Sequence, residues 1–301
     1  MPRRSGVIVA QARGGVTLRN LALAIMAFAT VSCTSMGDIP VSSVQPGSRY
    51  VALGSSFAAG PGLGSYRPGT PPRCTRALGN YPSLVSESMN LVLDDRTCSG
   101  ATVANILGPW GELPAQIDAV DGATRLVTVT VGGNDLDYVG NLVMSGCEPG
   151  SSVSFAGRSF PCTKPVAPAE ETYATLERNL TKLADEVAQR APEARLVFVQ
   201  YLTLLPQEMC AQTQMSAANA ALARETATRL AAITDRVAAA TGATVIKSDK
   251  LSRDHTACDA EPWSQGNVPS ALPGGAVPWH PNAAGHTAIA QALAVRLGWT
   301  D

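Results

Sequence analysis

The sequence has little charge and no excess of either sign. Lys, Arg, Asp and Glu make up 16% of the 301 residues, and the formal net charge is −1. So few charges exclude a disordered chain or a coiled coil, and the missing basic excess argues against a nucleic-acid partner. Hydrophobic residues make up 45%, enough to bury a full core, so we expect a globular protein.

The sequence also lacks the common metal and nucleotide motifs. It has three histidines and neither a CxxC nor an HExxH pattern, so we expect no metal site. The stretch GPGLGS from Gly60 has neither the GxGxxG spacing nor the lysine of a P-loop, so we expect no cofactor. A GxSxG motif is absent, which argues against the α/β-hydrolase fold.

Residues 1–33 are predicted to be a signal peptide. Four arginines precede the apolar run 21–31, which is too short to span a bilayer comfortably. The run ends in Thr-Val-Ser-Cys33, which resembles the bacterial lipoprotein box, whose cysteine is lipidated; a signal peptide that happens to contain a cysteine is the alternative. Residues 34–48 predict a polar tail or tether. We expect an exported protein, lipid-anchored at the cell envelope through Cys33 or secreted.

Short β-rich runs alternate with longer helical patterns after residue 49. Strands are predicted at 50–54, 91–98, 125–132, 195–205 and 243–248. A spacing of three and four predicts an amphipathic helix through Tyr173, Leu176, Leu180, Leu183 and Val187, and further helices are predicted at 217–242 and 282–297.

Apolar strands separated by helices predict an α/β protein with a parallel sheet covered on both faces. We expect a three-layer α/β/α sandwich around a flavodoxin-like, five-stranded parallel sheet of order 2-1-3-4-5. No repeat and no long linker divides the rest of the chain, so residues 49–301 are predicted to form one domain.

Six cysteines follow Cys33, an even number in a chain predicted to be exported, so we expect disulfides. Each cysteine closes or follows a predicted strand, at the sheet edge where such folds bind ligands. With the strand order 2-1-3-4-5, proximity predicts the pairs Cys74–Cys98, Cys147–Cys162 and Cys210–Cys258.

Three segments carry candidate chemistry. Ser56 ends the first strand in Gly54-Ser55-Ser56, where a nucleophile would lie, although a polar turn is the alternative. Asn134 follows the third strand in TVTVGGND, and its amide can donate two hydrogen bonds to an oxyanion; a turn is again the alternative. His280 precedes a proline suited to the first helical position, so its imidazole is expected in a loop, whereas His286 is expected to pack or cap within the helix.

These segments, in this order, resemble the SGNH hydrolases, a branch of the GDSL esterases and lipases, over most of the chain from Tyr50 onward. The family's first block resembles residues 54–60, which makes Ser56 the nucleophile, with Ser55 where the family usually has Asp. The glycine of its second block matches Gly100 in CSGAT, and its third block matches residues 132–135. His280-Pro281 matches the fifth block, in which Val277 occupies the usual Asp position.

Within this family, the chain resembles secreted actinobacterial SGNH esterases and lipases, which have three sequential disulfides and a His-Pro-Asn segment. It implies hydrolysis of carboxylic esters through an acyl-enzyme, with Ser56 as nucleophile and His280 as base. The backbone N–H groups of Ser56 and Gly100 and the side chain of Asn134 would form the oxyanion hole. Ser55 as the nucleophile is the alternative register.

The imidazole of His280 needs an acceptor that orients it, and Val277 has no suitable side chain. We expect the backbone carbonyl at Val277 to accept the imidazole proton, which leaves a Ser-His dyad. Asp254 and Asp259, after the fifth strand, are the alternatives.

The expected substrate is a small-molecule or lipid ester, bound by a monomer that lipidation at Cys33 would attach to a membrane. A carbohydrate or peptidoglycan O-deacetylase is the competing enzyme, because acetyl needs no long apolar trough. An inactive binding module on the same fold is the competing function outside catalysis. Three tryptophans, Trp110, Trp263 and Trp279, could line an acyl pocket, but packing is the favoured role for each.

Overall fold

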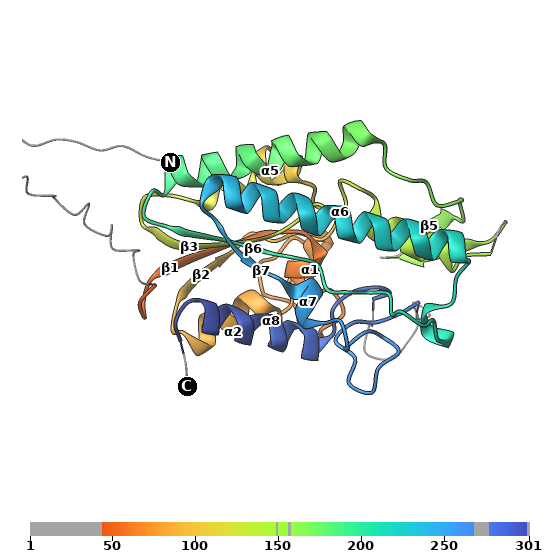
Figure 1. Ribbon diagram of the computed structural model, residues 1–301. Helices are drawn as coiled ribbons and strands as arrows, with labels where there is room; N and C mark the ends of the chain where they lie inside the picture. Colours follow the sequence, from red (N-terminus) through yellow and green to blue (C-terminus); the bar gives the residue numbers. More distant parts are fainter. Residues whose placement is uncertain (1–43, 149, 156–157, 268–276, 300–301) are drawn as a thin grey trace, which may run out of the picture. The chain divides into compact units, whose positions relative to one another are not determined.

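The computed structural model describes residues 44–148, 150–155, 158–267 and 277–299, and Figure 1 shows the arrangement of their helices and strands. The predicted signal peptide, Cys33 and residues 34–43 of the predicted tail lie outside the described residues. Val44, which the sequence assigns to the same tail, is buried in the hydrophobic core. Val44 therefore packs with the domain, whereas residues 45–47 are exposed.

A five-stranded parallel sheet forms the centre of the domain. Its strands, in spatial order, are β2 (Val92–Asp95), β1 (Arg49–Gly54), β3 (Thr124–Thr130), β6 (Arg195–Val199) and β7 (Thr244–Ile246). All neighbouring strands run parallel. Counted along the chain, these are the five predicted strands in the predicted order 2-1-3-4-5, which is confirmed.

Four of the five strands are shorter than the sequence suggests, namely β2, β3, β6 and β7. The carboxylate of Asp95 accepts hydrogen bonds from the backbone N–H and the hydroxyl of Thr97, at 3.0 and 2.6 Å, and this turn ends β2. At the other edge, the N–H of Gln200 donates to the carbonyl of Ile246, where β7 ends. The predicted strand 195–205 therefore leaves the sheet after Gln200 and continues as a loop.

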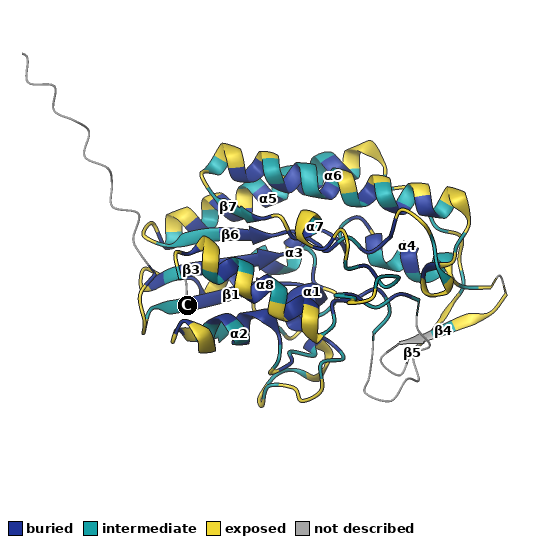
Figure 2. Ribbon diagram, turned by 60° about the horizontal axis from the view of Figure 1, so that its bottom comes forward, coloured by how far each residue is buried: buried dark blue, intermediate teal, exposed yellow. Residues whose placement is uncertain are grey.

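Helices cover both faces of the sheet, as Figures 1 and 2 show. One face carries α3 (Val103–Leu107), α5 (Glu170–Arg190) and α6 (Ala217–Thr241), which pack side by side. The other face carries α2 (Tyr81–Ser88) and α8 (Ala283–Arg296), which contact each other. The central strands β1 and β3 are buried almost throughout, whereas the edge strand β2 is partly exposed. The three-layer sandwich is confirmed.

The long helices begin and end where local chemistry predicts. The apolar stripe of α5 is buried through Tyr173, Leu176, Leu180, Leu183 and Val187. Helix α6 stops at Gly242, which adopts the left-handed conformation with φ +72°. Helix α8 starts after Asn282, whose side chain accepts a hydrogen bond from the N–H of Gly285.

Several short elements complete the described chain, and their brevity leaves no periodic pattern to predict them. They are the helices α1 (Ser56–Ala59), α4 (Tyr138–Ser145) and α7 (Ser248–Leu251) and the 3-10 turns Pro72–Cys74, Gln116–Ala119 and Ala211–Thr213. A separate antiparallel hairpin pairs β4 (Ser152–Phe155) with β5 (Arg158–Pro161). None of the described helices is long and apolar enough to cross a bilayer.

Three disulfides join Cys74 to Cys98, Cys147 to Cys162 and Cys210 to Cys258. The predicted pairing is confirmed. The loops that they close follow the carboxyl ends of the parallel strands.

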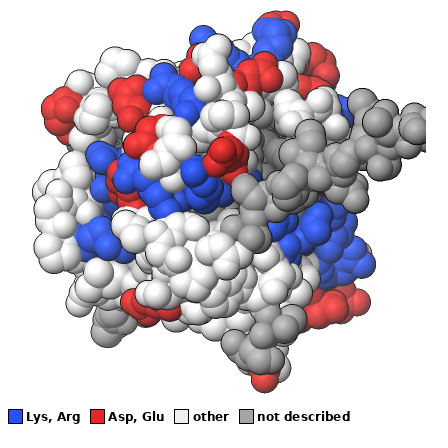
Figure 3. Space-filling view, turned by 90° about the vertical axis from the view of Figure 1, so that its left-hand side faces the viewer, with Lys and Arg blue, Asp and Glu red and all other residues white. Residues whose placement is uncertain are grey.

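The amino ends of the strands lie at the opposite edge of the sheet, where Figure 3 shows side chains of both charges interspersed. Several of them form ion pairs: Arg49 contacts Asp94 at 3.0 Å, and Arg125 contacts Glu193 at 2.8 Å. Charges at this edge therefore neutralise one another locally, and a functional site is better sought at the carboxyl edge.

Candidate active site

A tight elbow presents Ser56 at the carboxyl end of β1. Gly54 adopts φ +144°, and a Cβ at this position would lie 2.5 Å from the carbonyl oxygen of Thr130, so only glycine fits. Ser56 then begins α1, which ends after one turn at Gly60 in the left-handed conformation. The chain turns so sharply that Ser56 lies at the tip of the strand, 9% exposed.

Ser56 meets His280 from the far end of the chain. The hydroxyl of Ser56 lies 2.8 Å from Nε2 of His280, across 224 residues of sequence. The histidine loop is held beside residues 263–267, because the N–H of Gln265 donates to the carbonyl of His280 at 2.8 Å and the N–H of Asn282 donates to that of Trp263 at 2.9 Å. His280 is 6% exposed, so few solvent molecules reach the imidazole.

The other imidazole nitrogen, Nδ1, lies 2.7 Å from the backbone carbonyl of Pro278. A backbone carbonyl as the partner was predicted, but the predicted residue, Val277, is corrected to its neighbour. A carbonyl only accepts hydrogen bonds, so Nδ1 carries the proton and Nε2 is free to accept one from Ser56. Burial lowers the pKa of His280 to about 4, and the Pro278 carbonyl opposes that shift. The imidazole is therefore neutral at neutral pH.

The two aspartates considered as alternative partners do not replace this carbonyl. The carboxylate of Asp259 accepts hydrogen bonds from the N–H and the hydroxyl of Thr256, inside its own loop. Within the described part of the chain, no carboxylate of Asp254, Asp259 or any other residue is bonded to His280.

The other two predicted site residues, Gly100 and Asn134, lie in two different loops. Asn134 lies in the loop after β3, and hydrogen bonds join this loop to the one that carries Gly100. The side-chain amide of Asn134 donates to the carbonyl of Ala101 at 2.9 Å, and the carboxylate of Asp135 accepts from the N–H of Val103 at 3.1 and 3.2 Å. Gly100 adopts φ +86°, and a Cβ there would lie 3.2 Å from the ring of Trp110. These contacts set the loop that carries Gly100 beside Asn134.

One pocket of about 690 Å3 brings Ser56, Gly100, Asn134 and His280 together. Part of its wall is apolar and comes from α4 and the β4–β5 hairpin, through Val139, Val143, Met144, Val153 and Phe160. The Cys147–Cys162 disulfide joins the segment after α4 to the end of β5, so it ties these two parts of the wall together. Sequence reasoning missed the hairpin, although the two closely spaced cysteines marked its ends.

The tryptophans and the second histidine have packing roles. Trp279 is fully buried, and Trp263 stacks on His255 with ring centroids 3.9 Å apart. Trp110 lies under the guanidinium of Arg73, and none of the three tryptophans is among the described residues that line the pocket. His286 accepts a hydrogen bond at Nδ1 from the N–H of Tyr81, the first residue of α2, and thereby caps that helix.

Residues 52–288 match the sequence model of the GDSL-like Lipase/Acylhydrolase family, which is most of the chain and all of the pocket's central residues. The chain belongs to this family. The predicted membership and the predicted class of carboxylic ester hydrolase are thereby confirmed.

Known members of the GDSL-like family resemble the chain over most of its length. Lipase 2 of Streptomyces coelicolor is 30% identical over 249 residues, which cover 80% of this chain and 83% of that protein. A lipase of Streptomyces rimosus is 28% identical over 216 residues, 71% of this chain and 75% of that protein.

Solved structures show the same fold. The crystal structure of an extracellular lipase from Streptomyces rimosus has a TM-score of 0.64 at 25% identity, covering 82% of this chain and 99% of that chain. A phospholipase A1 from Streptomyces albidoflavus has a TM-score of 0.65 at 23% identity, covering 83% of this chain and 99% of that chain.

Proposed function

We propose that this chain is an exported serine esterase or lipase that hydrolyses acyl esters with Ser56 as nucleophile and His280 as general base. The observation that carries the proposal is the 2.8 Å contact between the Ser56 hydroxyl and Nε2 of His280, inside a pocket and at the carboxyl edge of a parallel sheet. A nucleophile within hydrogen-bond distance of a base that is itself oriented is the arrangement acyl transfer requires.

Acylation begins when Ser56 attacks the ester carbonyl and gives its proton to Nε2 of His280. The imidazole then carries a positive charge, which the Pro278 carbonyl stabilises through Nδ1–H in place of a carboxylate. His280 returns the proton to the departing alcohol, and the acyl group stays on Ser56. A water molecule, deprotonated by the same nitrogen, hydrolyses the acyl-enzyme and restores the serine.

The tetrahedral intermediates carry an oxyanion, for which we assign three donors. They are the backbone N–H groups of Ser56 and Gly100 and the side-chain amide of Asn134. One N–H of the Asn134 amide is used by the carbonyl of Ala101, which aims the amide and leaves its second N–H for the oxyanion. Loss of one such donor typically lowers kcat by about 100- to 1,000-fold.

The pocket supports an acyl chain longer than acetyl as the preferred group. Its volume of about 690 Å3 lies in the range of pockets that bury whole ligands, and the apolar wall runs from α4 to Phe160 of the hairpin. An O-deacetylase would have no use for such a wall. Lipase activity is therefore favoured over deacetylation.

Export is supported by the three disulfides, which form in oxidising compartments, and by the predicted signal peptide at residues 1–33. The Streptomyces rimosus lipase of similar structure is described as extracellular. We retain lipidation of Cys33 as part of the proposal, with the predicted tail as a tether only up to Val44, which packs in the core of the catalytic domain.

The test is hydrolysis of p-nitrophenyl esters from acetate to palmitate by the mature protein, Ser56→Ala and His280→Ala. Ser88→Ala, on α2 away from the pocket, is the matched control and should keep full activity. We expect both site variants to lose at least about 1,000-fold in kcat, with an optimum at chains longer than acetate. An optimum at acetate would favour the O-deacetylase, and an inactive parent protein would favour the binding module. An active Ser56→Ala would overturn Ser56 as the nucleophile.

A further inference from the structure

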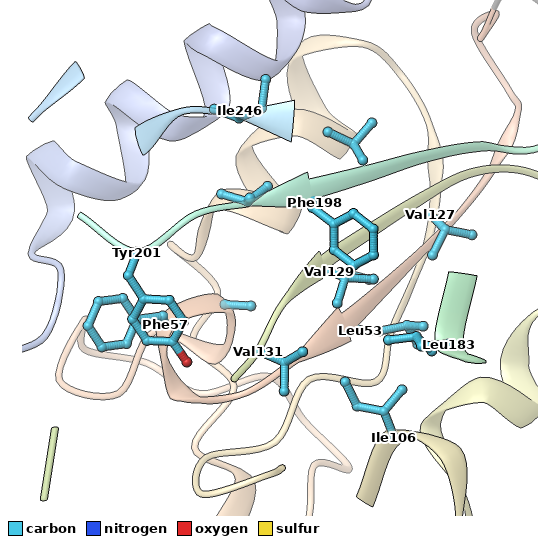
Figure 4. Packing of buried hydrophobic residues seen from close by; sticks show 14 of the residues in the cluster. Leu53, Phe57, Ile106, Val127, Val129, Val131, Leu183, Phe198, Tyr201 and Ile246 are labelled. Atoms are coloured by element: carbon cyan, nitrogen blue, oxygen red, sulfur yellow. The ribbon is translucent and has the colours of Figure 1, made fainter. Parts of the chain in front are cut away.

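The side chain of Tyr201 lies behind the pocket, where three segments of the site converge. Tyr201 follows β6 and is buried. Its ring packs on Phe57 with centroids 4.2 Å apart, and Phe57 packs in turn on the imidazole of His280 at 5.1 Å. Figure 4 shows the rings of Tyr201 and Phe57 lying together at the end of the strands. Phe57 directly follows Ser56, so this aromatic contact reaches both members of the dyad.

The hydroxyl of Tyr201 joins two loops. It accepts a hydrogen bond from the N–H of Gly133 at 3.1 Å, and it lies 3.1 Å from the hydroxyl oxygen of Ser55. Because the phenol accepts from Gly133, its own proton is best used on Ser55, whose oxygen accepts it. Burial raises the pKa of Tyr201 to about 12, so this proton stays in place at neutral pH.

Gly133 is adapted to this contact. A Cβ at Gly133 would lie 2.7 Å from the Tyr201 ring and hydroxyl, so the loop reaches the phenol only because the residue is glycine. The two residues bound by the phenol are the neighbours of Ser56 and Asn134 along the chain. The phenol thus spans the gap between the elbow after β1 and the loop after β3.

We propose that Tyr201 is a positioning residue, whose hydroxyl sets the distance between the Ser56 nucleophile and the Asn134 oxyanion donor. The inference rests on the proposed function. It also gives a role to Ser55, which stands where the family usually has Asp: its hydroxyl is the partner of the buried phenol at 3.1 Å. Without the hydroxyl, the N–H of Gly133 loses its buried partner, and the loop can shift away from the elbow.

The test compares Tyr201→Phe with Tyr50→Phe. The second variant is a matched control, because Tyr50 is equally buried in the sheet and its hydroxyl bonds the hydroxyl of Thr128 at 2.7 Å, away from both loops. Both variants keep the aromatic ring. Rates are measured on p-nitrophenyl butyrate. The maximal rate is divided by the concentration of active serines that a fluorophosphonate probe titrates, so that loss of folded protein does not lower the value of kcat.

We expect Tyr201→Phe to lower kcat by about 10- to 100-fold, the usual effect of a small misplacement of reacting groups, with KM within about twofold. Tyr50→Phe should leave kcat within about twofold, although it loses a buried hydrogen bond of similar length. Ser55 and Tyr201 share one hydrogen bond. The double variant Ser55→Ala, Tyr201→Phe should therefore lose no more kcat than the more damaging of the two single variants.

Three outcomes would overturn the inference. An unchanged kcat in Tyr201→Phe would do so, and so would an equal loss in Tyr50→Phe, which would indicate a general effect of a missing phenol. Losses that multiply in the double variant would show that Ser55 and Tyr201 act separately. If the parent protein hydrolyses no ester, or if Ser56→Ala retains activity, the proposed function fails first and this inference fails with it.

Discussion

The backbone carbonyl of Pro278 lies 2.7 Å from Nδ1 of His280, only two residues further along the chain. The group that orients the imidazole is therefore part of the same turn as the imidazole. Unlike an aspartate, it carries no full charge and no side-chain substitution removes it. A neutral partner also does little to raise the basicity of a buried histidine, which has consequences for pH dependence.

The first prediction concerns the pH dependence of activity. Burial lowers the pKa of His280 to about 4, and the imidazole acts as a base only when it is neutral. As the pH falls, kcat/KM of the free enzyme should therefore remain level through pH 6.5 and decline near pH 4. The measurement is the pH profile of kcat/KM with p-nitrophenyl butyrate. A decline centred at or above pH 6.5 would contradict the assignment.

The second prediction concerns stability. The pKa values of His280 and His286 are lowered to about 4 and about 3, chiefly by burial, so the unfolded chain binds protons at a higher pH than the folded one. The free energy of unfolding should thus fall as the pH drops from about 6.5 to about 4, by up to about 1.4 kcal/mol per pH unit for each histidine. Asp135 and Asp137 offset part of this fall, because burial raises the pKa of both carboxyls, that of Asp135 to about 6. Urea unfolding at a series of pH values measures it; a flat stability between pH 6.5 and 5 would refute it.

The third prediction tests Gly100. In Gly100→Ala, the new methyl group would meet the ring of Trp110 at 3.2 Å in a backbone with φ +86°, so the loop must move and take its N–H away from the oxyanion. We expect kcat to fall by about 100-fold. Gly64→Ala is the control, because Gly64 has φ +90° but open space around it. Equal kcat in the two variants would remove Gly100 from the oxyanion hole.

The fourth prediction tests the apolar wall. Val143→Phe enlarges a side chain on α4 that lines the pocket, and it should lower kcat/KM for the decanoate ester by about 10-fold while that for acetate stays within about twofold. Val295→Phe, on the exposed face of α8, is the matched control. A parallel decrease for both esters would mean that the acyl chain lies elsewhere.

The fifth prediction separates two disulfides. Replacing Cys147 and Cys162 with serine frees the hairpin from α4, so activity on long esters should fall more than activity on acetate. Replacing Cys210 and Cys258 opens a loop of 48 rather than 15 residues, and should cost more stability, about 4 against about 3 kcal/mol. Chain-length profiles and urea unfolding distinguish the two effects. An unchanged profile in the first variant would exclude the hairpin from substrate binding.

Much of the fold and of the candidate site could be predicted from the sequence alone. Apolar runs and helical spacings identified the five strands of the sheet and its long helices, because burial imposes these periods locally. Parallel strands end at one edge, so the order of the strands was sufficient to bring Ser56 and Asn134 together and to pair six cysteines, whereas His280 was added by the family resemblance.

Other features were decided only by the tertiary structure. Pro278 rather than Val277 faces the imidazole, in a turn where Trp279 adopts φ +58°, a backbone angle that residue type alone does not predict for a tryptophan. Tyr201 falls in a predicted strand, yet the end of β7 removes its strand neighbour and frees it to bond with the loops. Local patterns determine which segments are buried, whereas a contact between side chains from distant strands depends on where each strand ends.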